Sequence, residues 1–247
     1  MKRKLEICVD SVDSAIAAQK GGADRIELCG NLVVGGTTPS SILFSEIKKK
    51  VDIPVRVLIR PRFGDFCYSE NEFSIISGEI TMYRNLGADA VVVGCLCKDG
   101  GVNLEQMQQI VKAAGSMQLT FHRAFDVCKD PYIALEQIKQ LGIGTVLTSG
   151  QKNCFQDGKE LLRELVQISK NDIDIMPGGG VTPETLKNTA SYIGANVYHM
   201  SAKVIVDSIM EYRKEDVNMG LPSFSEYEIW QTSEEIVRKA KEMINQL

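Results

Sequence analysis

The sequence of 247 residues has few histidines, little tryptophan and no long apolar run. It contains two histidines and one tryptophan. No stretch approaches the about 20 apolar residues that a membrane-spanning helix needs. Residues 1–6 lead directly into a strand pattern, without the apolar core of a signal peptide. We therefore expect a cytoplasmic protein with no membrane partner.

A basic surface is also lacking. The net charge is −4, and the longest basic run is Lys48, Lys49 and Lys50. Proteins that bind nucleic acid by releasing counterions carry clustered positive charge, so no nucleic-acid partner is expected. The seven cysteines are an odd number and follow no signal peptide. This pattern favours free thiols in a reducing compartment over a disulfide framework.

A repeated pattern indicates the fold. In each of four stretches a glycine that can end a helix is followed by a polar turn and an apolar strand, at residues 22–28, 87–93, 142–148 and 194–200. Further apolar strands lie between them, at residues 5–9, 55–60, 118–122 and 174–176. Helix-start signals occur at Ser11, Thr38-Pro39, Asp130-Pro131 and Thr182-Pro183.

Eight strands that alternate with eight helical segments predict an α/β fold, a single (β/α)₈ TIM barrel spanning residues 1–247. Beyond Ser233, apolar residues recur on one helical face and predict a C-terminal helix that closes the outer layer. Residues 203–231 mix apolar and polar residues around Gly220 and Pro222, and no structure is predicted for them.

Strand alternation places unusual side chains inside this barrel. Every second residue of a strand faces the same way, which directs inward Glu6 and Cys8, Glu27 and Cys29, Arg60, His122, and His199 and Ser201. Barrel interiors are ordinarily filled by Val, Ile and Leu. Buried charges need partners, and Glu6 and Glu27 could pair with Arg60 and Arg62. Such a network either plugs the barrel or builds a site.

The stretch from Thr120 to Asp126 carries one of the two histidines at the end of a predicted strand. Parallel α/β folds place their chemistry at this end of the strands. His122 is the candidate general acid or base, oriented by Asp126 or a glutamate, because the pKa of histidine lies near neutrality. Glu6, Glu27 and His199 are expected to line the same cavity.

Two arginines and three glycines predict an anion site at the same face. Arg60 and Arg62 follow the third strand and could hold a carboxylate or phosphate. Barrels commonly bind phosphate on the backbone after strands 7 and 8, where this chain has Gly178, Gly179, Gly180 and Ser201. Ser149, after the sixth strand, is a weaker candidate. Surface salt bridges and a tight glycine turn are the structural alternatives.

Six motifs taken together resemble the CutC family. They cover residues 5 to about 202 in order and read ELCGNL from Glu27, GGTTPS from Gly35, RPRFGDF from Arg60, FHRAFD from Phe121, LTSG from Leu147 and MPGGG from Met176. The resemblance implies a cytosolic (β/α)₈ barrel with a role in copper homeostasis. In some members it implies Cu(I) bound by cysteines, with Cys8 and Cys29 as the matching thiols. The other five cysteines match no family motif.

Two hypotheses follow. In the first, Cys8 and Cys29 bind Cu(I). In-register pairing of their strands would place them about 5 Å apart, and Cu(I) accepts two thiolates. Cys95 and Cys97 are the alternative pair, and small buried fillers are the alternative role. In the second hypothesis, the protein is a lyase, isomerase or hydrolase that acts on a small anionic or phosphorylated substrate by Glu and His acid–base chemistry. No organic cofactor is evident, and a homo-oligomer is compatible with either.

Overall fold

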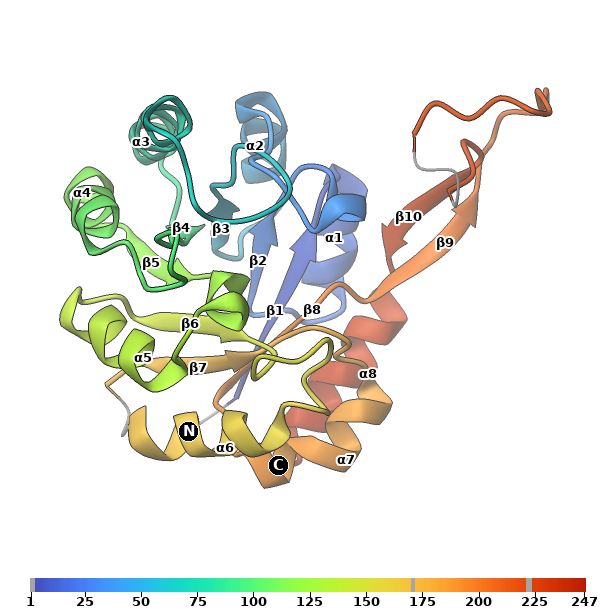
Figure 1. Ribbon diagram of the computed structural model, residues 1–247. Helices are drawn as coiled ribbons and strands as arrows, with labels where there is room; N and C mark the ends of the chain where they lie inside the picture. Colours follow the sequence, from blue (N-terminus) through green and yellow to red (C-terminus); the bar gives the residue numbers. More distant parts are fainter. Residues whose placement is uncertain (1–2, 170–171, 221–223) are drawn as a thin grey trace.

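The structure, a computed structural model, describes residues 3–169, 172–220 and 224–247 and confirms the (β/α)₈ barrel (Figure 1). Eight parallel strands form one sheet in the order β7-β6-β5-β4-β3-β2-β1-β8. The two end strands lie side by side and nearly close it. The strands are β1 Lys4–Val9, β2 Arg25–Leu28, β3 Val55–Leu58, β4 Ala90–Val93, β5 Gln118–Phe121, β6 Thr145–Thr148, β7 Asp174–Pro177 and β8 Val197–Met200.

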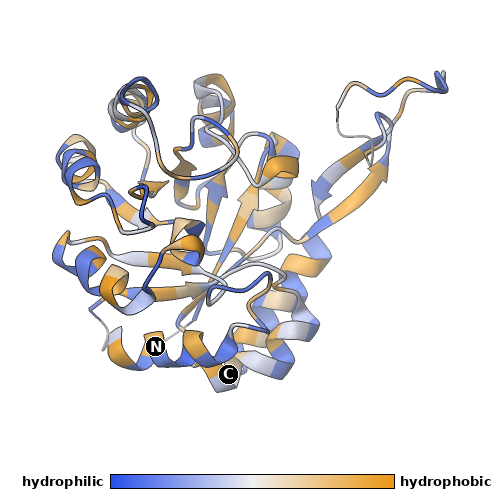
Figure 2. Ribbon diagram, in the orientation of Figure 1, coloured by the Kyte–Doolittle hydropathy of each residue, from blue (hydrophilic) through white to orange (hydrophobic). Residues whose placement is uncertain are grey.

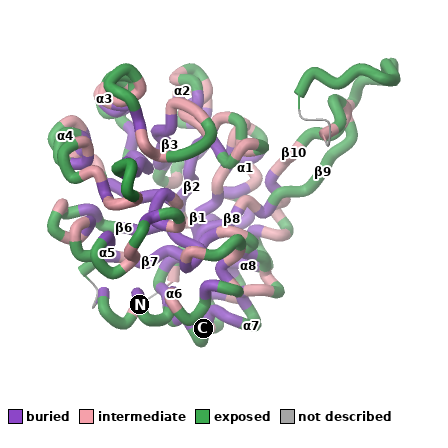
Figure 3. The backbone as a smooth tube through the Cα atoms, viewed as in Figure 1, coloured by how far each residue is buried: buried purple, intermediate pink, exposed green. Residues whose placement is uncertain are grey.

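The helices cover the outside of the barrel (Figure 1). They are α1 Val12–Lys20, α2 Ser41–Lys48, α3 Glu70–Asn85, α4 Leu104–Ala114, α5 Pro131–Gln140, α6 Lys159–Ser169, α7 Pro183–Ile193 and the C-terminal α8 Glu234–Asn245. The short 3₁₀ turns η1 Leu32–Val34 and η2 Arg123–Val127 follow β2 and β5. Outward-facing strand residues pack under the helices and form one buried core, shown in purple in Figure 3.

The helix-start signals are confirmed at three of their four positions. Ser11, Asp130 and Thr182 are N-caps whose side chains accept hydrogen bonds from backbone N–H groups of the first turn. At the remaining position, Thr38-Pro39, helix α2 starts later than predicted, because Ser40 rather than Thr38 is its N-cap. The Thr38 hydroxyl instead accepts from the Arg60 backbone N–H (2.9 Å) and donates to Glu79 (2.7 Å). These bonds attach the segment after β2 to β3 and α3.

Residues 203–231, for which no structure was predicted, contain most of an antiparallel hairpin. Its strands β9 Lys203–Asp207 and β10 Glu228–Thr232 project away from the barrel (Figure 1). Strand β9 is exposed along its whole length although it is hydrophobic (Figures 2 and 3). Neither face of β9 is buried. Its sequence therefore lacks the alternation of apolar and polar residues that marks a half-buried strand.

An ion network fills the amino-terminal part of the barrel interior. The carboxylate of Glu6 is completely buried and accepts a hydrogen bond from Arg25 on β2. Arg56 on β3 lies 3.5 Å from the same carboxylate and donates to Thr120 (2.7 Å). His199 on β8 contacts the other Glu6 oxygen (2.9 Å). The partners expected for Glu6 were Arg60 and Arg62, which instead lie in the loop after β3 and bond elsewhere.

The network keeps Glu6 ionised. Burial alone would raise its pKa, but the charges of Arg25, His199 and Arg56 lower the pKa to about 2. A buried carboxylate held in this way depends on each of its partners, because removing one leaves charge without compensation.

We expect Arg25→Met to destabilise the protein by about 3–5 kcal/mol, because it leaves the buried Glu6 carboxylate short of a cation. Urea denaturation followed by circular dichroism measures the change. The matched control is Lys48→Met, which breaks the exposed ion pair of Lys48 with Asp89 (3.1 Å) and should cost less than about 1 kcal/mol. Equal effects of the two substitutions would contradict a special role for the buried network.

Candidate functional site

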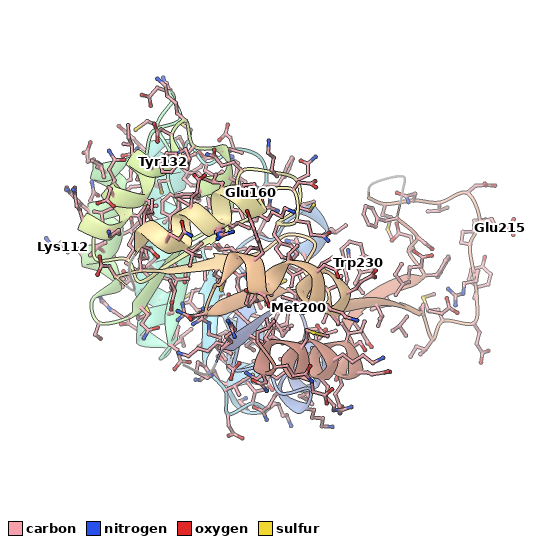
Figure 4. The ribbon with its side chains drawn as sticks, turned by 90° about the horizontal axis from the view of Figure 1, so that it is seen from below. Lys112, Tyr132, Glu160, Met200, Glu215 and Trp230 are labelled. Atoms are coloured by element: carbon pink, nitrogen blue, oxygen red, sulfur yellow. The ribbon has the colours of Figure 1, made fainter. Side chains whose placement is uncertain are left out.

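A cavity of about 620 Å³ opens at the carboxyl ends of the strands. Its wall includes strand-end residues, the loop after β3, the loop between β7 and α7, and the base of the hairpin. Figure 4 labels two of its lining residues, Met200 at the end of β8 and Trp230 on β10. The polar lining residues are Cys8, Asp10, Ser14, Glu27, Cys29, Arg60, His122, Arg123, Thr182, His199, Ser201, Lys203, Gln231 and Thr232.

Cys8, Glu27 and His199 form a compact cluster on one side of this cavity. One potential ligand atom from each residue lies within 4.8 Å of the others. The three residues come together because β1 lies between β2 and β8 in the sheet. The Nε2 atom of His199 is 3.5 Å from Glu27 Oε2, and its Nδ1 atom is 2.9 Å from Glu6 Oε1. Glu6 therefore fixes the orientation of the imidazole ring.

The strand register differs from the in-register pairing expected for the two cysteines. Cys8 pairs with Glu27, and Glu6 pairs with Arg25, so β2 is displaced by two residues relative to the expected alignment. This stagger is part of closing a barrel, in which neighbouring strands are sheared relative to one another. Cys29 remains near the cluster because its Sγ atom lies 3.5 Å from Glu27 Oε2, and Cys8 packs against the buried group that contains Cys29.

The cluster holds its protons unusually tightly. Burial raises the pKa of Glu27, although His199 opposes this change. Burial would lower the pKa of His199, but Cys8, Glu27 and Glu6 together raise it well above its ordinary value. Burial and the neighbouring Glu27 and Cys8 raise the pKa of the Cys29 thiol well above its usual range. At neutral pH, His199 is therefore an imidazolium and Cys29 a neutral thiol.

His122 lies on another part of the cavity wall, in a different environment. Its Nδ1 atom accepts a hydrogen bond from the Ala124 backbone N–H (3.2 Å), and the side chain is buried. A Cβ atom on Gly94 would lie 2.8 Å from Nδ1, so glycine is needed there for the ring to fit. Burial and the positive charge of Arg60 lower the pKa of His122 to about 3. The imidazole is therefore neutral, with its proton on Nε2.

Asp126 does not orient His122 as expected. Its carboxylate accepts hydrogen bonds from Arg123 (2.6 Å), the Thr148 hydroxyl (2.5 Å) and the Ser149 backbone N–H (2.9 Å). In residues 3–169, 172–220 and 224–247, no carboxylate is hydrogen-bonded to His122. Asp126 thus stabilises the loop after β6, and the catalytic roles predicted for the acidic residues and histidines stay predictions.

The residues predicted to bind an anion separate into two groups. Arg60, Gly179, Gly180 and Ser201 line the cavity. Arg62 is instead paired with Glu72 and Asp65 beside α3. Ser149 is bonded to Asp126, and Gly178 packs against Leu147 and His199. The second group therefore shapes the site without facing the cavity.

Sequence reasoning missed Arg25, Lys203 and Trp230. Arg25 has the same strand parity as Glu27, and this signal could have placed it inside the barrel. Lys203 and Trp230 lie in the segment that had no predicted structure, where the Lys203 ammonium stands 3.1 Å from the centre of the Trp230 ring. Both line the cavity, so the hairpin base contributes to the site.

The model of the CutC family matches residues 3–204, which include every strand of the barrel. The chain belongs to the CutC family. The copper homeostasis protein cutC homolog of Homo sapiens is 43% identical over 226 residues, which cover 91% of this chain and 83% of the human protein. A protein named CutC from Parabacteroides distasonis is 44% identical over 245 residues, covering 96% and 99% of the two chains.

A solved structure agrees with this assignment. The CutC protein of Streptococcus agalactiae superposes with a TM-score of 0.76 at 33% identity, covering 81% of this chain and 98% of that one. Thiamine phosphate pyrophosphorylase from Pyrococcus furiosus, with a TM-score of 0.58 at 14% identity, shares the fold alone. Of the helices in the described part of this CutC chain, none has the length and apolar character to cross a membrane.

The pKa of His122 predicts a pH dependence of stability. Below the ordinary pKa of 6.5 the unfolded chain binds a proton at this histidine, whereas the folded protein does so only near pH 3. The unfolded state therefore binds more protons between these values, and stability falls as the pH drops through this range. We expect His122 to account for a loss of about 2 kcal/mol between pH 7 and pH 5.

His122→Asn tests this expectation, because its side-chain oxygen can still accept the hydrogen bond from Ala124 but does not titrate. Urea denaturation of both proteins at pH 7 and pH 5 should show a smaller loss of stability in the variant. Parallel losses in the two proteins would mean that other groups cause the acid sensitivity.

Proposed function

We propose that this CutC protein binds Cu(I) at the mouth of its barrel through the Cys8 thiolate and the His199 imidazole, with Cys29 as a further thiol. The observation that supports this is the clustering of Cys8, Glu27 and His199, whose ligand atoms lie within 4.8 Å of one another. Thiolate and imidazole are ligands that copper accepts, and Cu(I) is satisfied by few of them. The human relative carries the name of a copper homeostasis protein.

The ligand set is compatible with Cu(I) and differs from that of a structural zinc site. A structural zinc site takes four nitrogen or sulfur ligands in a closed tetrahedron. Here the donors are one thiol, one imidazole and a carboxylate, with a second thiol bonded to that carboxylate. Because Glu6 occupies Nδ1 of His199, Nε2 is the nitrogen available to the metal. Copper binding would displace the proton on Nε2 of His199 and needs Cys8 as a thiolate, as metal binding to these groups generally does.

The burial of Cys29 gives the two thiols unequal roles. Cys8 is half-buried and lines the cavity beside the imidazole, whereas Cys29 is fully buried and its pKa is raised. A thiol must lose its proton to bind metal, so Cys29 is the harder thiol to recruit. Cys8 is therefore the primary ligand in this proposal.

An acid–base enzyme for a small anion is the second candidate. The observation that favours it is the Glu27–His199 pair, in which two groups with raised pKa values lie 3.5 Å apart beside the cavity. A cavity of about 620 Å³ is within the range of small-molecule sites and is much larger than a copper ion requires.

We expect Cys8→Ser to weaken Cu(I) binding by at least about tenfold, equivalent to about 1.4 kcal/mol, since it removes the accessible thiolate. Anaerobic titration of the reduced protein with Cu(I) against a coloured competing chelator measures the affinity. His199→Gln should also weaken binding, and Cys29→Ser should have a smaller effect than Cys8→Ser.

The matched control is Cys97→Ser, because Cys97 is exposed and does not line this cavity. Its affinity for Cu(I) should equal that of the wild type. If Cys8→Ser binds as tightly as the wild type while Cys97→Ser loses affinity, copper binds at the Cys95 and Cys97 pair instead and the proposal fails.

A further inference from the structure

The cavity wall after β3 contains a buried cation that is not paired with a carboxylate. Arg60 is 8% exposed and lines the cavity. Its guanidinium donates to the backbone carbonyls of Gly36 (3.0 Å) and Gly64 (2.8 Å). In the part of the chain that the structure describes, no carboxylate forms an ion pair with it, and both burial and the like charge of Arg62 lower its pKa. Buried charges are ordinarily paired.

Unsatisfied hydrogen-bonding atoms gather around the same loop. Four buried side-chain atoms have no hydrogen-bond partner within residues 3–169, 172–220 and 224–247. Three of them are Arg60 Nε, Tyr68 Oη and His122 Nε2, and the Tyr68 hydroxyl lies beside Arg60. Buried polar atoms are seldom left without partners, and each exception needs an explanation. Arg60 and His122 both line the cavity, where a bound ligand would supply the missing acceptors.

Arg60 and His122 both lie near the aromatic ring of Phe66. The Phe66 ring centre lies 5.0 Å from the Arg60 guanidinium carbon and 4.8 Å from the His122 ring centre. Phe66 itself lines the cavity. Since Nδ1 of His122 accepts the Ala124 hydrogen bond, Nε2 carries the proton and can only donate. A ligand that contacts the Phe66 ring is therefore close to both a cation and an N–H donor.

We propose that this wall of the cavity binds a small organic anion, whose carboxylate or phosphate oxygens accept from Arg60 and His122 and whose apolar body lies in the rest of the cavity. The anion compensates the buried charge of Arg60, and charge-assisted hydrogen bonds are the stronger class. The body would contact Leu58, Leu147, Met200 and Trp230, which line the remaining wall. This site stands whether or not copper binds, because it shares neither Cys8 nor His199.

Thermal unfolding with three aromatic probes of equal body and different head group tests the proposal. Benzoate, phenyl phosphate and neutral benzamide are compared at constant ionic strength. At least one anion should raise the melting temperature by mass action, and benzamide should raise it less. Preference between benzoate and phenyl phosphate distinguishes a carboxylate site from a phosphate site.

Three variants locate the binding site. Arg60→Gln removes the charge, and His122→Asn removes the Nε2 donor while keeping an acceptor for Ala124. Each should weaken anion binding at least about tenfold by isothermal titration, as expected from the loss of a hydrogen bond with a charged partner. The matched control is Arg62→Gln, since Arg62 neighbours the site but is paired with Glu72 and does not line the cavity. It should bind the anion as the wild type does.

The outcomes separate this site from the copper site. Cys8→Ser should retain anion binding, and Arg60→Gln should retain Cu(I) binding. If Arg60→Gln does not fold, His122→Asn alone carries the comparison. The proposal is overturned if neither anion stabilises the protein more than benzamide does. It is equally overturned if binding survives both Arg60→Gln and His122→Asn, or if Arg62→Gln abolishes it.

Discussion

The buried carboxylate of Glu6 is the interaction on which the interior of this barrel depends. It binds Arg25, Arg56 and His199, which come from three other strands, and so joins β1, β2, β3 and β8 at one point. A carboxylate in this position is tolerable only while its cations are present. The same contact fixes the direction of the His199 ring, so the geometry of the proposed copper site depends on the ion network beneath it.

Local signals in the sequence predicted the elements of the fold, because helix caps and strand patterns depend on residues that are close together in the sequence. The caps at Ser11, Asp130 and Thr182 are examples. The register between strands was not predictable in the same way. It is set by the shear that closes the whole barrel. Cys8 therefore pairs with Glu27 and not with Cys29. The hairpin escaped prediction because β9 buries neither face.

For the candidate site, strand parity predicted which residues face inward but not what they contact. Asp126 follows His122 by four residues in the sequence. The 3₁₀ turn η2 nevertheless directs the Asp126 carboxylate to Thr148 and Ser149. Arg60 and Arg62 lie two residues apart in the same motif, but only Arg60 lines the cavity. Arg62 does not, because Glu72 on α3 binds it. Contacts of this kind depend on loop conformations, so two arginines of one motif can lie in different surroundings.

The two proposed sites occupy electrically different walls of one cavity. The wall formed by β1, β2 and β8 presents Glu27, Asp10 and Cys8, whereas the wall after β3 presents the uncompensated Arg60. An anion is disfavoured at the acidic wall and favoured at the cationic one. A Cu(I) ion bound to one thiolate and a neutral imidazole forms a group without net charge, so the occupied copper site would not draw an anion away from Arg60. The physical separation of charge therefore allows one CutC cavity to hold a soft cation and an organic anion without requiring either for the other.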